Sequence, residues 1–417
     1  MAIIGIWFGC DRTPENPFND THQSRILETG CNRVIVSRHY LDATYDLNSE
    51  KDVAQWAKGN SSRPRMIPGQ TRADNPSYLN CLNQWSRRTF LYDAHKVSGH
   101  EAELAEQSYD NIRSEIDGVE GFLVYHEAGT CFSGLTPVMD KLTQKFKADR
   151  GYDPELWAVE DRTKTMEWDD FYSIFWYYSN NTVFMSERYN WVETWSEQKR
   201  IEEFEKPMTD TAEDARIRRN QYACRWTAIV AAHRDEYRKY YTPNFEELRF
   251  TSLLPIGLGA EGIVYFVFDW TSNTDCTDDI YRNSATRQNI SNLKPRINWL
   301  EDRLNAYTYS GWKYNTTDGG WESFPESEYI DRIEENQGDF TSWRKKLIMG
   351  FWEGAAGHEA WPITSRDPWT GNYSYTVYFK KNTHVIWEGE DKGILTQFSF
   401  TMPPGDTKLL ELGPEIY

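Results

Sequence analysis

The sequence predicts an α/β fold, a (β/α)8 TIM barrel followed by a C-terminal antiparallel β domain. Short apolar segments alternate about eight times with helical segments between Met1 and Gly311, as is typical of parallel βα units. A barrel of this kind needs about 250 residues, which this stretch provides. The first strand is followed by Gly9-Cys10-Asp11-Arg12, which is no glycine-rich phosphate turn. An open doubly wound sheet would usually have such a turn, so we prefer the barrel.

The predicted barrel strands are short runs rich in β-branched and aromatic residues. In order they are Ile3–Phe8, Arg33–Ser37, Arg65–Pro68, Phe122–Tyr125, Leu156–Val159, Thr182–Met185, Lys239–Tyr241 and Gly262–Phe268.

The predicted helices begin at capping residues such as Asn48 and end at glycines such as Gly30, Gly59 and Gly151. Acidic residues in its first turn support the long helix that starts at Thr211. In order the predicted helices are Thr21–Glu28, Asn48–Lys58, Gly99–Ile116, Thr136–Ala148, Trp168–Tyr178, Thr211–Arg234, Phe245–Leu258 and Ile290–Tyr307.

The pattern changes after the barrel, and we expect residues 1–312 to form the barrel, 313–345 a linker or decoration, and 346–417 a β-sandwich domain. The linker is polar and rich in Gly, Ser and acidic residues, and Pro403–Asp406 reads as a tight turn. The expected strands are Lys346–Phe351, Tyr373–Phe379, Thr383–Trp387, Ile394–Thr401 and Lys408–Leu412.

The composition indicates a carbohydrate partner. The net charge is −18, which argues against nucleic acid or an anionic membrane surface as a partner. Aromatic residues make up 15% of the chain, with 18 Trp and 25 Tyr, and flat aromatic rings suit the faces of sugar rings, although a Trp-rich core is the simpler explanation for any one of them. The six cysteines are scattered and the eight histidines form no metal motif, so no metal and no cofactor are expected.

The location of the protein follows only by default from the sequence. No signal peptide is seen, so we expect a cytoplasmic protein, or an extracellular or virion-associated one if a leader was removed or export takes another route. The oligomeric state stays open.

Acidic residues follow several predicted strands, where catalytic groups of a barrel lie. Glu127 follows the fourth strand, and a carboxylate directly after a buried strand has no packing reason to be there. Cleavage of a glycosidic bond needs two carboxyl groups, one protonated donor and one nucleophile or base. Glu127 is our first candidate for a catalytic carboxyl group and Glu187 for its partner, with Glu160 and Asp161 next. An ion pair is the alternative, because Arg162 and Arg188 directly follow Asp161 and Glu187.

Further polar and aromatic residues at or just past the predicted strand ends are candidates for substrate binding. The aromatic ones would stack on sugar rings or simply pack, and the histidines would bind hydroxyls or be satisfied core groups. The candidates are Trp7, His39, Tyr40, Tyr125, His126, Tyr189, Trp191, Tyr241, Asp269 and Trp270.

Three segments resemble glycoside hydrolases of the type with a (β/α) barrel and a C-terminal β-sandwich. They are Tyr125-His126-Glu127, the run Leu258–Phe266 and the tail Met402–Leu412. The resemblance implies a general acid/base at the end of strand four, which Glu127 matches. In the large retaining group the nucleophile is a Glu at the end of strand seven, whereas the predicted seventh strand here is followed by Thr242-Pro243-Asn244, with no acid until Glu246.

Two functions therefore stay open. The first is a glycoside hydrolase that cleaves a poly- or oligosaccharide with a carboxylate pair. The second is a non-catalytic glycan-binding or structural protein on the same barrel, for example on a virion or cell surface. The absence of the strand-seven Glu and of a leader favours the second.

Overall fold

The structure of this 417-residue protein is a computed structural model. It describes residues 2–8, 18–36, 48–69, 72–74, 88–126, 134–161, 181–219, 225–269, 275–314, 327–336 and 343–414.

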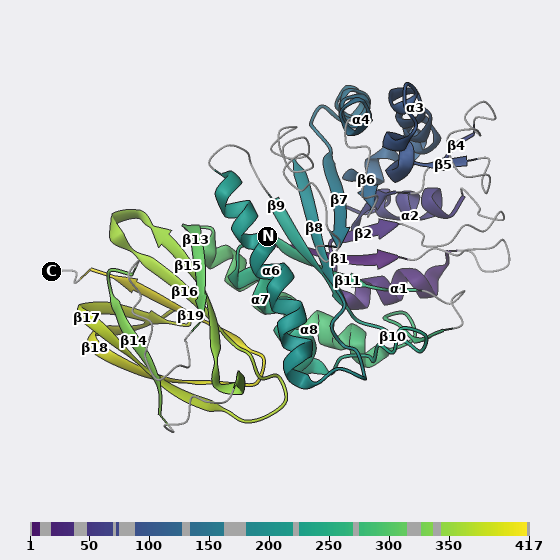
Figure 1. Ribbon diagram of the computed structural model, residues 1–417. Helices are drawn as coiled ribbons and strands as arrows, with labels where there is room; N and C mark the ends of the chain where they lie inside the picture. The colour runs from purple at the N-terminus through teal and green to yellow at the C-terminus, as the bar shows by residue number, and fades with distance from the viewer. Residues whose placement is uncertain are drawn as a thin grey trace.

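An eight-stranded parallel sheet forms the N-terminal part of the structure, in the spatial order β3-β2-β1-β11-β9-β8-β7-β6 (Figure 1). A parallel bridge between Met66 of β3 and Val119, just before β6, joins the two ends of this order, so the sheet closes into a barrel. The predicted (β/α)8 barrel is confirmed. Its strands are β1 (Ile3–Phe8), β2 (Arg33–Val36), β3 (Arg65–Pro68), β6 (Gly121–His126), β7 (Glu155–Asp161), β8 (Thr182–Arg188), β9 (Arg225–Ala231) and β11 (Gly262–Phe266).

Helices cover the outside of the barrel, and their ends follow local chemistry. The Asn19 side chain caps the first helix by accepting hydrogen bonds from the backbone of Thr21 and His22, and Gly30 ends that helix with φ 67°. The helices are α1 (Asp20–Thr29), α2 (Asn48–Lys58), α3 (Glu101–Ile112), α4 (Leu135–Arg150), α6 (Glu197–Arg219), α7 (Phe245–Gly257) and α8 (Ser284–Leu304). Shorter elements are the strands β4 (Arg72–Asp74), β5 (Arg88–Phe90), β10 (Arg234–Asp235) and β12 (Cys276–Asp278), and 3-10 turns that include Leu91–Lys96 and Arg113–Gly118. The predicted helix Trp168–Tyr178 lies outside the described residues.

The seventh barrel strand differs from the prediction. The segment expected to be a helix from Thr211 to Arg234 holds the end of α6 and then β9. Lys239–Tyr241 is no barrel strand: it ends a turn, and Tyr240 forms only isolated bridges. α6 begins at Glu197, well before Thr211, and runs through Pro207. The residues of β9, rich in Ala and β-branched side chains, suit either a helix or a buried strand. Pairing with β8 and β11 on its two sides decides for the strand.

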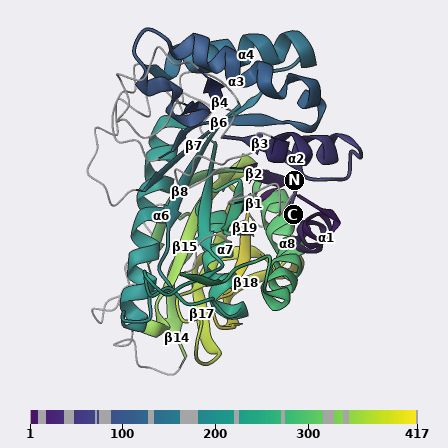
Figure 2. The same cartoon turned by 90° about the vertical axis from the view of Figure 1, so that its right-hand side faces the viewer.

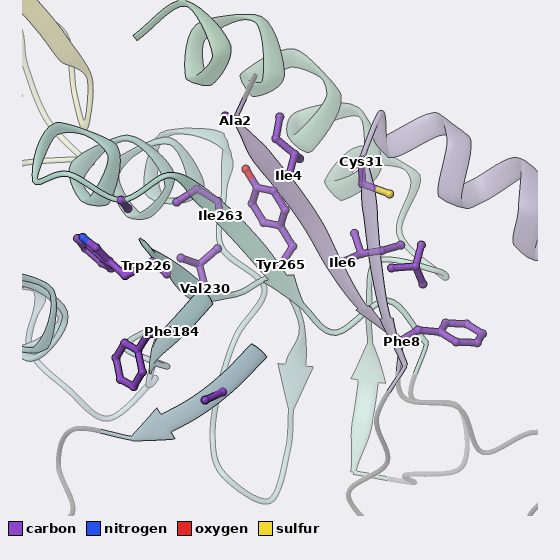
Figure 3. Packing of buried hydrophobic residues seen from close by; sticks show 14 of the residues in the cluster. Ala2, Ile4, Ile6, Phe8, Cys31, Phe184, Trp226, Val230, Ile263 and Tyr265 are labelled. Carbon is purple, nitrogen blue, oxygen red and sulfur yellow. The ribbon is translucent and has the colours of Figure 1, made fainter. Parts of the chain in front are cut away.

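Side chains of each barrel strand alternate between two cores. On β1, Ile3 and Trp7 point into the barrel, whereas Ile4 and Ile6 lie under the helices. Figure 3 shows the core between the barrel and its helices, where Ile4, Ile6 and Tyr265 gather. The alternation defines which strand-end residues face the barrel interior.

A second, antiparallel sheet follows the barrel, and the predicted C-terminal β domain is confirmed. Strands form at residues 307–314, across the start of the expected linker, and at residues 330–335, inside it. The exact domain boundaries stay a prediction. One long β17 takes the place of two predicted strands. The strands are β13 (Tyr307–Tyr314), β14 (Ile330–Glu335), β15 (Leu347–Gly354), β16 (Glu359–Ser365), β17 (Tyr373–Trp387), β18 (Glu390–Met402) and β19 (Thr407–Gly413).

This sheet packs against α6, α7 and α8 and lies away from α3 and α4 (Figures 1 and 2). The approach is close: the Trp352 indole donates to the Gly257 carbonyl at 2.9 Å, and a Cβ on Gly350 would lie 2.0 Å from the same oxygen. None of the described helices has the length and apolar character that crossing a membrane requires.

Candidate active site

Glu187 is the acidic side chain that the described structure places at the carboxyl end of the barrel interior. It follows Val183 and Met185 on β8, both of which belong to the interior core. Its side chain is buried, with 7% of the residue exposed, and Oε2 accepts a hydrogen bond from the Tyr189 hydroxyl at 3.2 Å.

The ion pair that the sequence suggested for Glu187 does not form with its neighbour Arg188. Arg188 lies on the opposite face of β8, where its guanidinium pairs with Glu203 of α6. The two adjacent charges therefore serve different surfaces, and the placement of Glu187 is not explained by Arg188.

Aromatic rings surround this end of the barrel. The Trp7 ring lies 5.4 Å from His126 and 5.9 Å from Phe266. The Tyr189 ring lies 5.1 Å from Phe266. Two further rings, His233 and Tyr240, contact Tyr189 at 6.0 and 5.9 Å. We call these six residues the aromatic cluster: Trp7, His126, Tyr189, His233, Tyr240 and Phe266. Trp7 is 1% exposed, so it forms the floor of the cluster and not an open platform.

A bulge in β6 decides which of its last residues faces the barrel. The register with β7 shifts between Leu123 and Tyr125, so that Tyr125 pairs with Ala158 and His126 with Val159. Tyr125 is consequently buried at 0% exposure under the helices, and His126 reaches Trp7 instead. Of these two predicted substrate contacts, the structure brings only His126 to the cluster.

Two other predicted contacts, Trp191 and Tyr241, lie in a separate cluster with the antiparallel domain. The Trp191 ring packs edge-on against Trp369 at 6.3 Å, and the Tyr241 hydroxyl donates to Glu247 at 2.6 Å. The Trp369 indole donates to the same Glu247 oxygen at 2.7 Å. These rings support the contact between the two parts of the protein.

Asp269 is also placed apart from the aromatic cluster. It is 2% exposed, and its carboxylate lies 3.2 Å from Nε2 of His22 on α1. The ring of that histidine stacks on Tyr281 at 4.5 Å, so Asp269 belongs to a buried polar contact beneath the helices.

Several predicted residues fall outside the described part of the chain, namely Glu127, His39, Tyr40 and Trp270. For Glu160 and Asp161 the structure describes the backbone alone. Their strand β7 pairs Glu160 with Ser186 and Asp161 with Glu187.

His233 is a member of the cluster that the sequence did not reveal, because it fell inside a predicted helix. It lies two residues after the end of β9. Its Nδ1–H donates to the Phe266 carbonyl at 3.1 Å, since a carbonyl oxygen only accepts. Burial lowers the pKa of His233 to about 4. The strand-seven end thus carries a neutral imidazole, and the first acid after it, Asp235, is buried and accepts from the Arg238 backbone at 2.8 Å.

A loss of stability in mild acid is expected from His233. The unfolded chain binds the proton with a pKa near 6.5, the folded protein only near 4, so the free energy of unfolding falls as pH drops through this window. Above pH 6.5 both states are neutral and His233 contributes no pH dependence. Between pH 7 and pH 5 the contribution amounts to about 2 kcal/mol. Urea unfolding at both pH values should show that His233→Gln loses this part of the pH dependence, and an identical dependence in both proteins contradicts the assignment.

The described residues contain no group of three His, Cys, Asp or Glu side chains arranged to hold a metal ion. Within the same residues, Cys31 and Cys276 are free thiols.

No protein-family model matches this sequence, and no curated protein matches it. Solved structures do. A GH27 β-L-arabinopyranosidase from Geobacillus stearothermophilus, solved with arabinose, matches with a TM-score of 0.56 and 10% identity over 100% of this chain and 97% of that one. A putative α-galactosidase from Bacteroides fragilis matches with a TM-score of 0.54 and 9% identity over 100% and 80% of the two chains. A putative α-galactosidase/melibiase from the same species matches with a TM-score of 0.52 and 11% identity over 98% and 79%.

At such identities the likeness concerns the fold. It extends over the barrel and the antiparallel sheet together, since the matches cover nearly the whole chain. The chain therefore has the fold of these glycosidase structures, a (β/α)8 barrel followed by an antiparallel β domain.

Proposed function

We propose that this protein is a glycoside hydrolase that cleaves a bond in an oligo- or polysaccharide, with Glu187 as one of two catalytic carboxyl groups. The observation that carries the proposal is the buried Glu187 carboxylate at the carboxyl end of β8, bound by Tyr189 and next to the aromatic cluster. The carboxyl ends of the strands are where barrel enzymes carry their catalytic groups.

Glu187 suits the role of nucleophile or base. The Tyr189 hydroxyl donates to one of its oxygens, and such a bond holds an ionised carboxylate in a defined orientation. A nucleophile or base must be ionised, whereas the acid that protonates the leaving oxygen must hold its proton. The proton donor then has to be another residue.

Glu127 is the proposed donor. It directly follows His126, the last residue of β6, whose ring contacts Trp7 in the aromatic cluster. β6, β7 and β8 are neighbours in the sheet, so a pair from β6 and β8 can face one substrate. The end of the seventh strand, as the structure has it, reads Ala232-His233-Arg234-Asp235 and has no Glu in the position of the large retaining group. Asp161, in register with Glu187, and Glu160 are the next candidates.

The similar solved structures agree with a sugar substrate. One of them holds arabinose, and two are putative α-galactosidases. The aromatic cluster of this chain offers the flat apolar surfaces that sugar rings contact.

A screen for reducing-end release from neutral and weakly charged polysaccharides tests this function. We expect turnover of at least one polysaccharide, and a decrease of about 10²-fold in Glu127→Gln, because glutamine cannot donate the proton. Glu261→Gln is the matched control, since Glu261 lies before β11 at the other end of the barrel and pairs with Arg225. Its turnover should stay at the wild-type level.

Two outcomes contradict the proposal in different ways. Unchanged turnover in Glu127→Gln removes Glu127 from the mechanism and leaves the function. Glycan binding without turnover in the wild type supports the alternative, a barrel that recognises glycans without cleaving them.

A further inference from the structure

The chain leaves the seventh barrel strand through a tight turn that stands beside the aromatic cluster. In this turn the backbones of Asp235 and Tyr240 exchange two hydrogen bonds, of 3.2 and 3.0 Å. β10 pairs with β12, and Figure 1 draws β10 at the end of the barrel away from the antiparallel sheet. The turn is thus anchored on both sides.

Further bonds hold the tip of the turn. The buried Asp235 carboxylate accepts from the Arg238 backbone at 2.8 Å, and the Lys239 carbonyl accepts from the Glu193 backbone at 2.8 Å. Lys239 has φ 60°, a conformation that costs about 1 kcal/mol for a residue with a Cβ. The neighbouring contacts keep this strained shape, so the tip presents its side chains in a defined arrangement.

Tyr237 is the side chain at the tip, and it is 80% exposed. The other exposed large hydrophobic side chains of the described chain range from Tyr152 at 39% to Ile217 at 55%. Single exposed apolar side chains are common on protein surfaces, so the exposure of Tyr237 by itself indicates no ligand. What points to a ligand is the combination of this exposed ring with an ordered turn beside the aromatic cluster.

The turn connects Tyr237 to the candidate active site. Tyr240, at the base of the turn, lies 5.9 Å from Tyr189 and 5.8 Å from His233, ring to ring. Tyr189 in turn binds Glu187. Aromatic rings therefore continue from the floor of the barrel to the base of the turn that carries Tyr237.

Exposed charged side chains lie on the turn and next to it. Arg234 lies 2.8 Å from Glu236 and 3.6 Å from Glu193, and all three are more than 40% exposed, at 44%, 43% and 44%. Planar charged groups on the same turn can bind sugar hydroxyls while the ring contacts the apolar face.

We propose that Tyr237 is a stacking platform for a sugar unit outside the barrel, beyond the unit that lies at Glu187. This inference rests on the proposed function and deepens it. The substrate is then an oligosaccharide of several units, and Tyr237 selects it over a glycoside with a small leaving group.

Chain-length dependence tests the platform. The probes are oligosaccharides of two to six units from a polysaccharide that the wild type cleaves or binds, and the 4-nitrophenyl monoglycoside of the same sugar. Tyr237→Ala should raise KM for the longer chains by about two- to ten-fold, as expected for one lost ring contact, and leave the monoglycoside unaffected. Tyr237→Phe keeps the ring and should behave as wild type. Tyr152→Ala is the control for the loss of an exposed tyrosine elsewhere on the protein. Tyr152 is 39% exposed and lies just before β7, at the end of the barrel where the strands begin.

The outcomes separate this inference from the proposed function. If the oligosaccharides bind without being cleaved, the hydrolase is refuted and dissociation constants are measured in place of KM. The platform is then supported if the affinity of the wild type rises with chain length and Tyr237→Ala abolishes that rise. If cleavage occurs and Tyr237→Ala has wild-type KM at every length, the platform is refuted and the hydrolase stands. A protein that neither binds nor cleaves any of these glycans overturns both.

Discussion

Replacing Glu187 with glutamine is expected to lower kcat by about 10³–10⁴-fold on any glycoside that the protein cleaves. The amide keeps the shape of the side chain and can still accept from the Tyr189 hydroxyl, so folding should be little affected. What it loses is the negative charge that, in the proposed mechanism, attacks the sugar or activates water. Initial rates at saturating substrate, with thermal melting of both proteins, measure the two effects separately.

Two further variants accompany this experiment, one as a control and one as a second test. Glu203→Gln changes an acid that lies next to β8 but outside the barrel, where it pairs with Arg188, and should leave kcat unchanged. Tyr189→Phe removes one hydrogen bond to Glu187 and should lower kcat by about ten-fold, a loss of about 1.5 kcal/mol. Turnover of Glu187→Gln equal to that of Glu203→Gln refutes a catalytic role for Glu187.

Removing the Arg366 side chain is expected to lower the free energy of unfolding by about 3–5 kcal/mol. Arg366 follows β16 and donates to both oxygens of Glu205 on α6, at 2.6 and 2.5 Å. The two side chains are only 6% and 1% exposed, and the Tyr314 hydroxyl donates to Glu205 as well, at 3.2 Å. Arg366→Ala leaves the Glu205 carboxylate buried without its cation, between the barrel and the antiparallel sheet. Denaturant unfolding measures the loss.

The same helix offers a matched control. Lys206 and Asp210 form an exposed pair on α6 at 2.8 Å, and Lys206→Ala should cost about 0.5 kcal/mol or less. The double variant Glu205→Leu/Arg366→Met should recover much of the stability, because it removes both charges together. A loss in Arg366→Ala as small as in Lys206→Ala shows that this pair does not hold the two parts together.

The barrel could be predicted from local signals. β1 and β3 have the bounds that their apolar runs predicted, and α1 ends at Gly30 as a glycine stop indicates. The failure was β9, whose residues suit a helix as well as a strand. Only neighbouring strands on both sides resolve such a segment, and they come from distant parts of the chain.

The candidate site was predictable in part. That Glu187 ends a buried strand could be predicted, because an acid that follows an apolar run is a local pattern, and β8 has it there; its catalytic role stays a prediction. His233 was missed with β9. Tyr125 was misplaced, because one extra residue in β6 exchanges the faces of the residues after it. Trp191 and Tyr241 were taken for site residues because nothing near them reveals Trp369, which packs there from the antiparallel domain.

By itself, the sequence determined that most of these short apolar segments become buried parallel strands and that acidic and aromatic residues follow them. Those properties depend on burial and capping within a few residues. Only the tertiary structure decided which of the side chains meet: Glu187 with Tyr189 and the aromatic cluster, Arg188 with Glu203, Asp269 with His22. These contacts depend on strand register, on one bulge and on segments far apart in the chain, and no local pattern carries that information.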